Sequence, residues 1–518
     1  MKKNSTFYGT IIVDKDQVTV DSYDTGAAPI IDGSISVTGW TGLGGNIYSK
    51  VIVFNYLNNE GLGNISEDGV MLTPQGWATD YTTSMAGKPD GSYTFDWTNR
   101  VMYIKTASGP NTKTYRVSFE LFGVKFKDGV NNGVVKNIDI KRFSLNGVEF
   151  MNCDGCQAIN LNISNGGGAV VAVQRVAGFD YMYAGNGIEF DHSSTNGLID
   201  GSTITSMFDS CLSPQTYVSN RFSSNQTFRN LTLSKCGFAG IEISILSNGG
   251  NTGSSISNIT VSNVTMTDMG KGWSGKRYGT EGYGIRIAAD AGAGSISNTV
   301  ITNVNISNSI NHAIHIVGET GVTTISKSKF TSNGGMGVSV TEATYTSPKL
   351  KIDTSVFAKN GDAGVSYHCV NCQGINLFNN TFVDNTTFNL AIWAQATEAK
   401  IQNNIFYSTS PIAQFYSFNA ALRGNVTVDN NCYKEGINMY AYNNVTYHTI
   451  ATFNATNTAL DNNSTAIITA GFTNTASEDY SLTSASDCKA SGALILGISS
   501  DIDGKPFSNP PSAGAYQF

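Results

Sequence analysis

A four-residue pattern, in which a small residue is followed by apolar, variable and apolar positions, returns along the middle of the chain. Its clear copies are Gly147-Val-Glu-Phe, Gly187-Ile-Glu-Phe, Gly240-Ile-Glu-Ile, Gly284-Ile-Arg-Ile, Ala313-Ile-His-Ile, Gly337-Val-Ser-Val and Gly364-Val-Ser-Tyr. The alternation is typical of a β-strand. Weaker copies begin at Gly168, Cys211 and Ala391. Together, the clear and weaker copies recur at intervals of 19 to 44 residues, by subtraction of their first positions. Such intervals match the coils of a β-solenoid.

A second motif lies between these copies and carries Asn at its centre. Its copies are Val135-Lys-Asn-Ile-Asp-Ile, Phe228-Arg-Asn-Leu-Thr-Leu, Ile256-Ser-Asn-Ile-Thr-Val, Gly374-Ile-Asn-Leu-Phe-Asn and Lys400-Ile-Gln-Asn-Asn-Ile. We expect a further strand per coil with Asn at the bend, where its side chain can bond to neighbouring backbone and to equivalent Asn residues. Abundant β-branched residues and Asn argue against helices.

Segments near both ends resemble those of bacterial right-handed parallel β-helix enzymes of the pectate-lyase-like superfamily. They are residues 18–33, the strand pair at 90–97 and 101–105, and the closing segments at 501–506 and 514–516. The resemblance implies an all-β, right-handed parallel β-helix with a small β-rich insertion near the N-terminus. The expected boundaries are 1–37 for the first coils or cap, 38–122 for the insertion, 123–450 for the core with its catalytic face, and 451–518 for the last coils and closing segment.

Composition narrows the choice of partner. Charged residues make up 14% of the chain and the formal net charge is −7, with no basic tract, which argues against nucleic acid and anionic membranes. No apolar run of about 18 residues is present, so we expect no membrane insertion. The opening residues lack the apolar stretch of a signal peptide.

The eight cysteines include two close pairs, Cys153 with Cys156 and Cys369 with Cys372. A shared zinc site would require the two pairs to meet across about 216 residues of stacked coil. Buried thiols or local disulfides are the favoured interpretation.

The third residue of each strand copy should point outward and stack on its counterparts at about 4.8 Å per coil. The expected column is Glu149, Val170, Glu189, Ser213, Glu242, Arg286, His315, Ser339, Ser366 and Trp393, with Asp191, Gln215 and Ser244 in a parallel column. Charged residues crowd the middle of these columns, although the chain as a whole is poor in charge. Glu149 is expected to be an ordinary surface residue.

Two long interruptions flank this patch and should wall a groove. The first, from Ala172 to Asn186, contains Asp180 and Tyr181. The second, from Leu246 to Tyr283, contains Trp273, Lys276, Arg277 and Tyr283 itself. Aromatic rings can stack on sugar rings, and Lys and Arg can bind hydroxyl or carboxylate groups. With Gln215, Arg286 and His315, these are the expected substrate-binding residues.

The expected catalytic residues are Asp209, Glu242, Glu189 and Asp191. Carboxylates two coils apart lie roughly 9 to 10 Å apart at the backbone, from where side-chain rotation can reach the separations of either class of glycosidase. Crowding also raises carboxyl pKa values, which helps one acid to stay protonated. Asp209 could instead cap a turn, and Arg286 could be a structural partner of Glu242.

The stretch from about residue 187 to 288 resembles, in order, the polygalacturonase motifs NTDGFD, DDC, GHG and RIK. Asp191 matches the last acid of the first motif, and Asp209 matches the general-acid position of the second. Ser210, Ala239 and Ala288 replace the second acid, the His and the Lys of the family pattern. The resemblance therefore implies a sugar other than polygalacturonate.

These observations predict a bacterial, secreted or periplasmic glycoside hydrolase acting on a carbohydrate polymer or oligosaccharide, with no required cofactor. The first alternative is a polysaccharide lyase that cleaves a uronate glycan by β-elimination, for which Ca²⁺ is an option. The second is a glycan-binding spike without activity. The sequence leaves the metal question and the oligomeric state open.

Overall fold

A computed structural model describes the chain outside residues 54–61, 76–80, 97–98, 173–181, 248–249, 251, 274–280, 319–320, 343–348, 370–372, 394–395, 411–412, 418–421, 436–437, 443–444 and 458–459. The chain forms two compact units. Unit 1 comprises Met1–Pro214, Asn230–Glu242 and Asp268–Gly282, and unit 2 comprises Gln215–Arg229, Ile243–Thr267 and Tyr283–Phe518.

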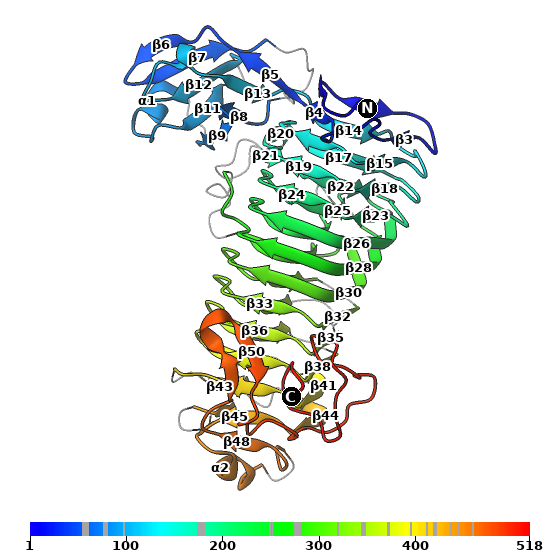
Figure 1. Cartoon of the computed structure of the whole chain (residues 1–518), viewed down its shortest axis with the longest axis vertical. Coiled ribbons are helices and arrows are strands. Elements are labelled where there is room, and N and C mark those ends of the chain that lie inside the picture. Colours follow the sequence, from blue (N-terminus) through cyan, green and yellow to red (C-terminus); the bar gives the residue numbers. More distant parts are fainter. Residues whose placement is uncertain are drawn as a thin grey trace. The chain divides into compact units, whose positions relative to one another are not determined.

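Unit 1 is built from coils of short parallel strands (Figure 1). One sheet contains β2 (Ile11–Val13), β14 (Phe122–Phe126), β17 (Asn146–Met151) and β22 (Ile188–Asp191), each paired with the next. A second sheet includes β15 (Val134–Lys136), β16 (Asp139–Lys141), β18 (Gln157–Ile159), β19 (Asn162–Ser164), β23 (Leu198–Asp200) and β24 (Thr203–Thr205). The parallel pairing of strands from successive coils confirms the predicted right-handed parallel β-helix.

Close coil contacts explain why the strand motif begins with a small residue. A Cβ atom on Gly147 would lie 2.5 Å from the carbonyl oxygen of Gly187. Inside the coil, the ring of Phe150 lies 4.8 Å from the rings of both Phe126 and Phe190. This ring spacing matches the spacing of neighbouring strands, so the apolar positions form a continuous stack.

A mainly antiparallel region, which begins with β5 and ends with β13, interrupts the coils of unit 1. One sheet has the order β5 (Ser34–Val37), β13 (Tyr115–Ser118), β8 (Ile65–Glu67) and β9 (Val70–Met71). The other has the order β10 (Thr73–Pro74), β11 (Ser92–Asp96), β12 (Val101–Lys105), β7 (Ile47–Val51) and β6 (Thr41–Gly44), with helix α1 (Tyr81–Ala86) nearby. Buried Trp40, Phe95 and Tyr115 belong to a core of its own. The domain boundaries given above remain a prediction.

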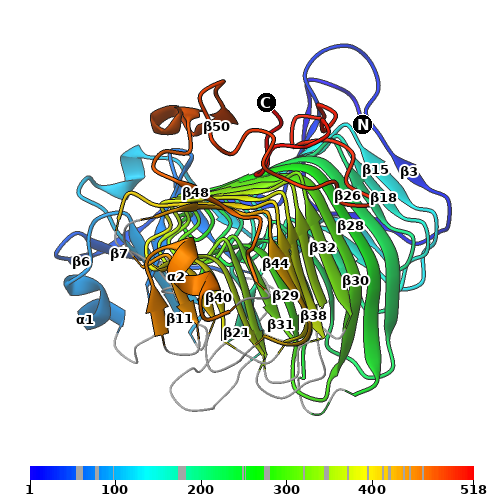
Figure 2. The ribbon, with the colours of Figure 1, turned by 90° about the horizontal axis from the view of Figure 1, so that it is seen from below.

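Unit 2 continues the same architecture with longer strands at its start. β28 (Ser254–Thr267) and β30 (Gly294–Ser307) pair in parallel along their length, and β32 (Val322–Ser326) follows them, as Figure 2 shows. β35 (Lys349–Asp353) pairs with β32 in turn. The opposite sheet runs from β29 (Tyr283–Ala289) through β31 (Ile314–Val317), β34 (Val338–Glu342), β37 (Ala363–Cys369) and β40 (Phe388–Ile392). An aromatic stack of Phe330, Phe357, Phe382, Phe406 and Tyr433 fills the coils.

The predicted Asn bends are confirmed by a left-handed φ at Asn137, Asn230, Asn258 and Asn403. The copy at Gly374 is the exception, because its Asn376 lies inside β38 (Gly374–Phe378) and the left-handed residue is Asn379. Asn137 lies between β15 and β16 with a φ of 59°, a left-handed conformation that Asn tolerates well. Equivalent Asn side chains bond to one another from coil to coil. Asn160 Nδ2 donates to Asn137 Oδ1 at 2.8 Å, and Asn303 Nδ2 donates to Asn263 Oδ1 at 2.8 Å.

Two members of the predicted outward column are wrong. Val170 belongs to a small antiparallel hairpin of β20 (Ala169–Ala172) and β21 (Met182–Ala184), so Glu149 aligns directly with Glu189. In β40, Ala391 rather than Trp393 aligns with Ser366. Both errors arose because a short apolar pattern fixes neither the sheet nor the register of a weak copy.

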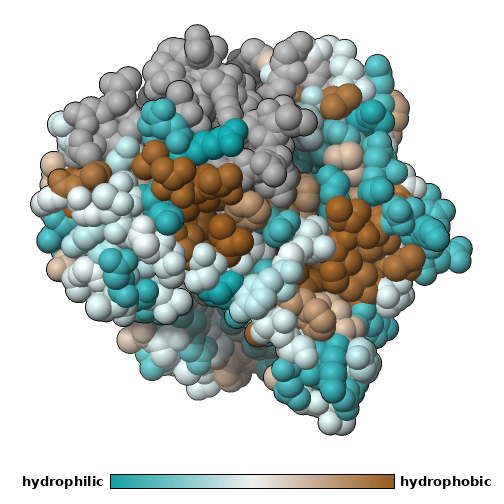
Figure 3. Space-filling view, turned by 90° about the horizontal axis from the view of Figure 1, so that it is seen from above, coloured by the Kyte–Doolittle hydropathy of each residue, from teal (hydrophilic) through white to brown (hydrophobic). Residues whose placement is uncertain are grey.

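The ends of the chain differ from the repeating coils. Figure 3 shows patches of apolar surface on the face viewed from above. The first strands of the chain expose Phe7, Tyr8 and Ile12. The C-terminal segment runs back along unit 2, where Asn403 Nδ2 donates to the carbonyl oxygen of Ala493 at 2.6 Å. No helix in the described part of the chain is long and apolar enough to cross a membrane.

Candidate functional site: a buried acidic row in unit 1

Three neighbouring strands bring Lys125, Glu149 and Glu189 into one column. Lys125 aligns with Glu149 between β14 and β17, and Glu149 aligns with Glu189 between β17 and β22. β25 (Leu212–Thr216) follows β22 in the strand order and β27 (Ala239–Ile245) follows β25, so the strand of Glu242 is two coils from that of Glu189. We call Glu149, Glu189 and Glu242 the acidic row.

Two asparagines hold the carboxylates of the row. Asn146 Nδ2 donates to Glu149 Oε2 at 3.1 Å and also to Glu189 Oε2 on the next coil. Asn186 Nδ2 donates to Glu189 Oε2 at 3.4 Å, and its backbone amide donates to Asn146 Oδ1 at 3.0 Å. Asn146 and Asn186 thus link two carboxyl groups into one buried network.

A sequence pattern could have predicted the position of these asparagines beside the carboxylates. The spacing Asn-x-x-Glu occurs at two strands that pair in register, at Asn146 to Glu149 and at Asn186 to Glu189. On equivalent strands this spacing places each amide on the same edge of the coil, within reach of its own carboxylate and of the neighbouring one.

The prediction that Glu149 is an ordinary surface residue is wrong. Its exposed fraction is 5%, and Lys125 Nζ lies 2.7 Å from its Oε1 atom. Burial raises the pKa of Glu149, while the Lys125 cation and the Asn146 amide act in the opposite direction. The environment of Glu149 therefore favours its protonated carboxyl.

Glu242 is held by the strand that lies between it and Glu189. Ser210 Oγ donates to Glu242 Oε2 at 3.0 Å, and the Ser210 amide donates to Asn186 Oδ1 at 2.9 Å. Asp209 is half-buried in the turn just before β25, where its carbonyl oxygen accepts from the Phe238 amide at 3.0 Å. Hydrogen bonds through Asn186 and Ser210 therefore connect Glu189 with Glu242.

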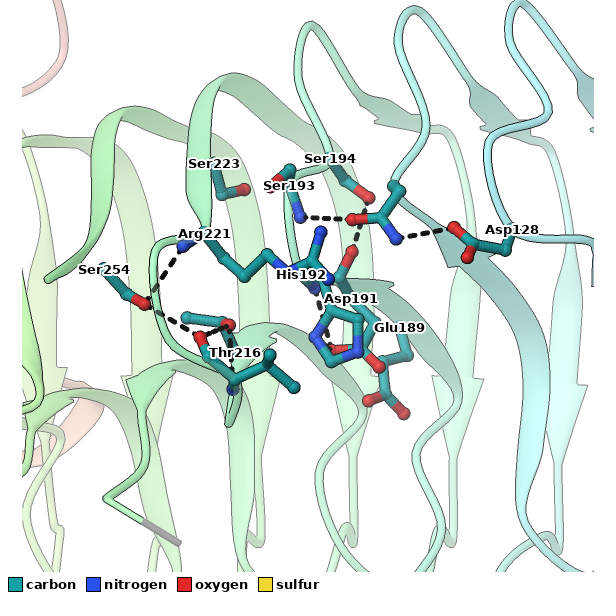
Figure 4. A network of polar contacts seen from close by, with 12 residues as sticks. Asp128, Glu189, Asp191, His192, Ser193, Ser194, Thr216, Arg221, Ser223 and Ser254 are labelled. Carbon is teal, nitrogen blue, oxygen red and sulfur yellow. Dashed lines mark hydrogen bonds and ion pairs between the residues drawn. The ribbon is translucent and has the colours of Figure 1, made fainter. Parts of the chain in front are cut away.

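Asp191 lies at the end of β22, two residues beyond Glu189 and on the same face of the strand. Its exposed fraction is 2%, and its Oδ1 atom accepts from the His192 amide at 2.8 Å and lies 3.0 Å from His192 Nδ1. Figure 4 shows Glu189, Asp191 and His192 close together at this strand end. The charge of Asp191 also contributes to the raised pKa of Glu149.

Unit 2 brings together a different set of the predicted residues. Arg286 aligns with His315 between β29 and β31. The ring of Tyr283 is stacked on that of His315 at 5.1 Å, and His312, which the sequence did not single out, contacts His315 edge-on at 5.1 Å. We call Tyr283, His312 and His315 the imidazole cluster.

The remaining predicted binding residues are divided. Trp273 belongs to unit 1, where its Nε1 atom donates to the carbonyl oxygen of Ser206 at 2.9 Å and its ring lies 5.4 Å from that of Phe208. Gln215 is half-buried in β25. The last four, Asp180, Tyr181, Lys276 and Arg277, lie outside the described residues.

The cysteines of the described part form local pairs. Disulfides join Cys153 to Cys156 and Cys211 to Cys236, whereas Cys432 and Cys488 are free and buried. Across the described residues, no group of three or more His, Cys, Asp or Glu side chains is arranged to hold a metal ion.

Comparisons with known proteins agree with the coil architecture. Residues 283–471 match the family model described as right handed beta helix region, which confirms the predicted β-helix likeness for that part of the chain. No curated protein matches the chain in sequence. Its structure is similar to three solved structures among others.

The first is described as the complex structure of XylC with xylose, with 13% identity, a TM-score of 0.46 and coverage of 84% of this chain and 79% of that one. The second, pectate lyase Pel9A, has 13% identity, a TM-score of 0.43 and coverage of 76% and 88%. The third, described as a glycoside hydrolase, has 8% identity, a TM-score of 0.41 and coverage of 73% and 87%.

Proposed function

We propose that the protein is a glycoside hydrolase whose acidic row supplies the acid and the base or nucleophile. The observation that carries this proposal is the Asn146 amide, which bonds to carboxylates of two adjacent coils. Glycosidic bonds are cleaved by such carboxyl pairs, one protonating the leaving oxygen and the other attacking the anomeric carbon or activating water. Glu149 holds the proton, and Glu189, which accepts from two amides, acts as the carboxylate.

The spacing of this pair favours a definite stereochemical course. Both Oε2 atoms accept from Asn146 Nδ2, so they lie within two hydrogen-bond lengths, roughly 6 Å, of each other. Retaining enzymes place their carboxyl groups about 5 to 5.5 Å apart, whereas inverting enzymes need about 6.5 to 9.5 Å. The Glu149 and Glu189 pair therefore predicts retention of the anomeric configuration.

A pair drawn from Asp209, Glu242 and Glu189 would act differently. Glu189 and Glu242 lie two strands apart, which suits the wider separation of an inverting enzyme. Proton NMR of the first product anomer distinguishes the two assignments: retention favours Glu149 with Glu189, and inversion favours Glu242, with Asp209 as the acid.

The compartment and the partner follow from the same proposal. The two disulfides fit an oxidising environment outside the cytoplasm, so we place the enzyme in the periplasm or the extracellular space of a bacterium. The substrate is a carbohydrate polymer or oligosaccharide, and the acid and base chemistry of carboxyl groups requires no cofactor.

The test is a screen of the full chain against neutral and uronate-containing polysaccharides. Release of reducing ends without ultraviolet absorbance of an unsaturated product is the expected result. An unsaturated uronate product would replace the hydrolase by a lyase. Binding without any cleavage would reduce the protein to a glycan-binding spike.

A further inference from the structure

We propose that the imidazole cluster of unit 2 is a binding subsite for an uncharged sugar unit. The proposal extends the proposed hydrolase by naming the class of sugar that it takes. It starts from a repeated strand position: Tyr283 lies three residues before Arg286, and His312 lies three residues before His315, on strands that pair in register. Rings from two coils therefore meet at one edge of the sheet.

The three rings form a compact aromatic surface. The Tyr283 ring is stacked on that of His315 with an interplanar angle of 24° and lies 6.0 Å from that of His312. Both His residues are partly exposed, whereas Tyr283 has an exposed fraction of 8%. Aromatic faces of this kind suit the apolar C–H faces of sugar rings.

Both imidazoles are neutral near neutral pH. Burial lowers the pKa of His312 to about 4, which the Asp362 charge partly opposes. Burial, His312 and the Arg286 cation together lower the pKa of His315 to about 3. The backbone amide of Met336 donates to His312 Nδ1 at 2.9 Å, so the neutral His312 ring carries its proton on Nε2.

One nitrogen atom of the cluster is best paired by a ligand group that can both donate and accept a hydrogen bond. His315 Nδ1 is buried and makes no hydrogen bond to any residue that the structure describes. A neutral imidazole presents either an N–H or a lone pair at this atom, and a hydroxyl group can pair with both. A carboxylate pairs only with the N–H, because it has no hydrogen to donate. An uncharged sugar unit, rich in hydroxyl groups, therefore fits the cluster best.

The test measures binding, so that it does not depend on turnover. The full chain carrying Glu189→Gln is titrated by calorimetry with xylo-, gluco- and manno-oligosaccharides and, separately, with oligogalacturonates. We expect a neutral oligosaccharide to bind. His315→Phe, which keeps an aromatic ring but removes both nitrogens, should weaken that binding about tenfold, the value of one hydrogen bond to a buried group. His368→Phe, at an exposed position of β37, is the matched control.

The outcomes separate the subsite from the reaction. Binding of oligogalacturonates alone, no binding of any probe, or equal affinities for the His315→Phe and control variants would overturn the subsite. If a neutral oligosaccharide binds through His315 but the native chain does not cleave it, the subsite stands and the hydrolase proposal fails. Circular dichroism of both variants shows whether the coils are retained.

Discussion

Replacement of a single buried carboxyl should change how the stability of unit 2 depends on pH. Asp461 ends a ladder of buried amides: Asn404 Nδ2 donates to Asn431 Oδ1 at 3.0 Å, and Asn431 Nδ2 donates to Asp461 Oδ1 at 3.3 Å. The Tyr433 hydroxyl donates to Asp461 Oδ2 at 3.2 Å. With 1% of Asp461 exposed, burial raises its pKa from 3.8 to about 7 despite these donors.

The sign follows from proton binding. The folded chain keeps the Asp461 proton up to about pH 7, whereas the unfolded chain releases it near pH 4. Between these values the folded state binds more protons, so its stability falls as pH rises. At about 1.4 kcal/mol per pH unit, the loss over this window is roughly 4 kcal/mol. The contribution is fully present below pH 4 and lost above about pH 7.

Asp461→Asn should remove this dependence, because an amide of the same shape can keep Oδ1 as an acceptor and carries no charge. Hydrogen exchange of the amides around β45 (Cys432–Lys434), read as local opening free energies from pH 4 to 8, is the assay, since solenoid coils open locally. Asp384→Asn, which removes a half-buried carboxylate that accepts from the Thr409 amide at 2.6 Å, is the control. Equal pH dependence in the native and Asp461→Asn chains would refute the reasoning.

Two further changes test unit 1. Lys125→Met removes the cation that lowers the pKa of Glu149, so the alkaline limb of the pH–activity profile should move to higher pH. The control Lys127→Met, at a more exposed position, should leave the limb in place. An alkaline limb that stays in place in both variants would contradict the role of Glu149. Cys211 and Cys236, which are 25 residues apart, form a disulfide whose reduction should lower the free energy of unfolding by about 3 kcal/mol, because the unfolded chain gains conformational entropy. The unfolding temperature should fall accordingly. An unchanged thermal transition after complete reduction would argue against that bond.

The coils could be predicted from the sequence because the chemistry of a solenoid repeats. Each coil needs a small residue where backbones approach and an apolar residue facing inward, so Gly147 and Phe150 recur in kind at Gly187 and Phe190. Register failed only at weak copies such as Val170, where a hairpin leaves the coil. A short apolar pattern does not reveal whether its segment lies in the coil or in a hairpin outside it.

The candidate site was predictable only in part. Alternation placed Glu149 and Glu189 in one column, and the structure aligns them. Alternation cannot report burial, which depends on neighbours such as Lys125 and Asn146 that pack against the carboxylates. An outward position on a solenoid strand was therefore mistaken for a solvated one at Glu149.

The measurement that bears most directly on the acidic row is the kcat of Glu189→Gln on the glycan that the native chain cleaves best. The amide keeps the shape of the side chain but can neither attack nor accept a proton, so kcat should fall by about a thousandfold or more. Glu398→Gln, at a carboxylate of unit 2 paired with Lys349, should retain native activity. Native activity in the Glu189→Gln chain, with the fold intact, would contradict the assignment of the row as the catalytic centre.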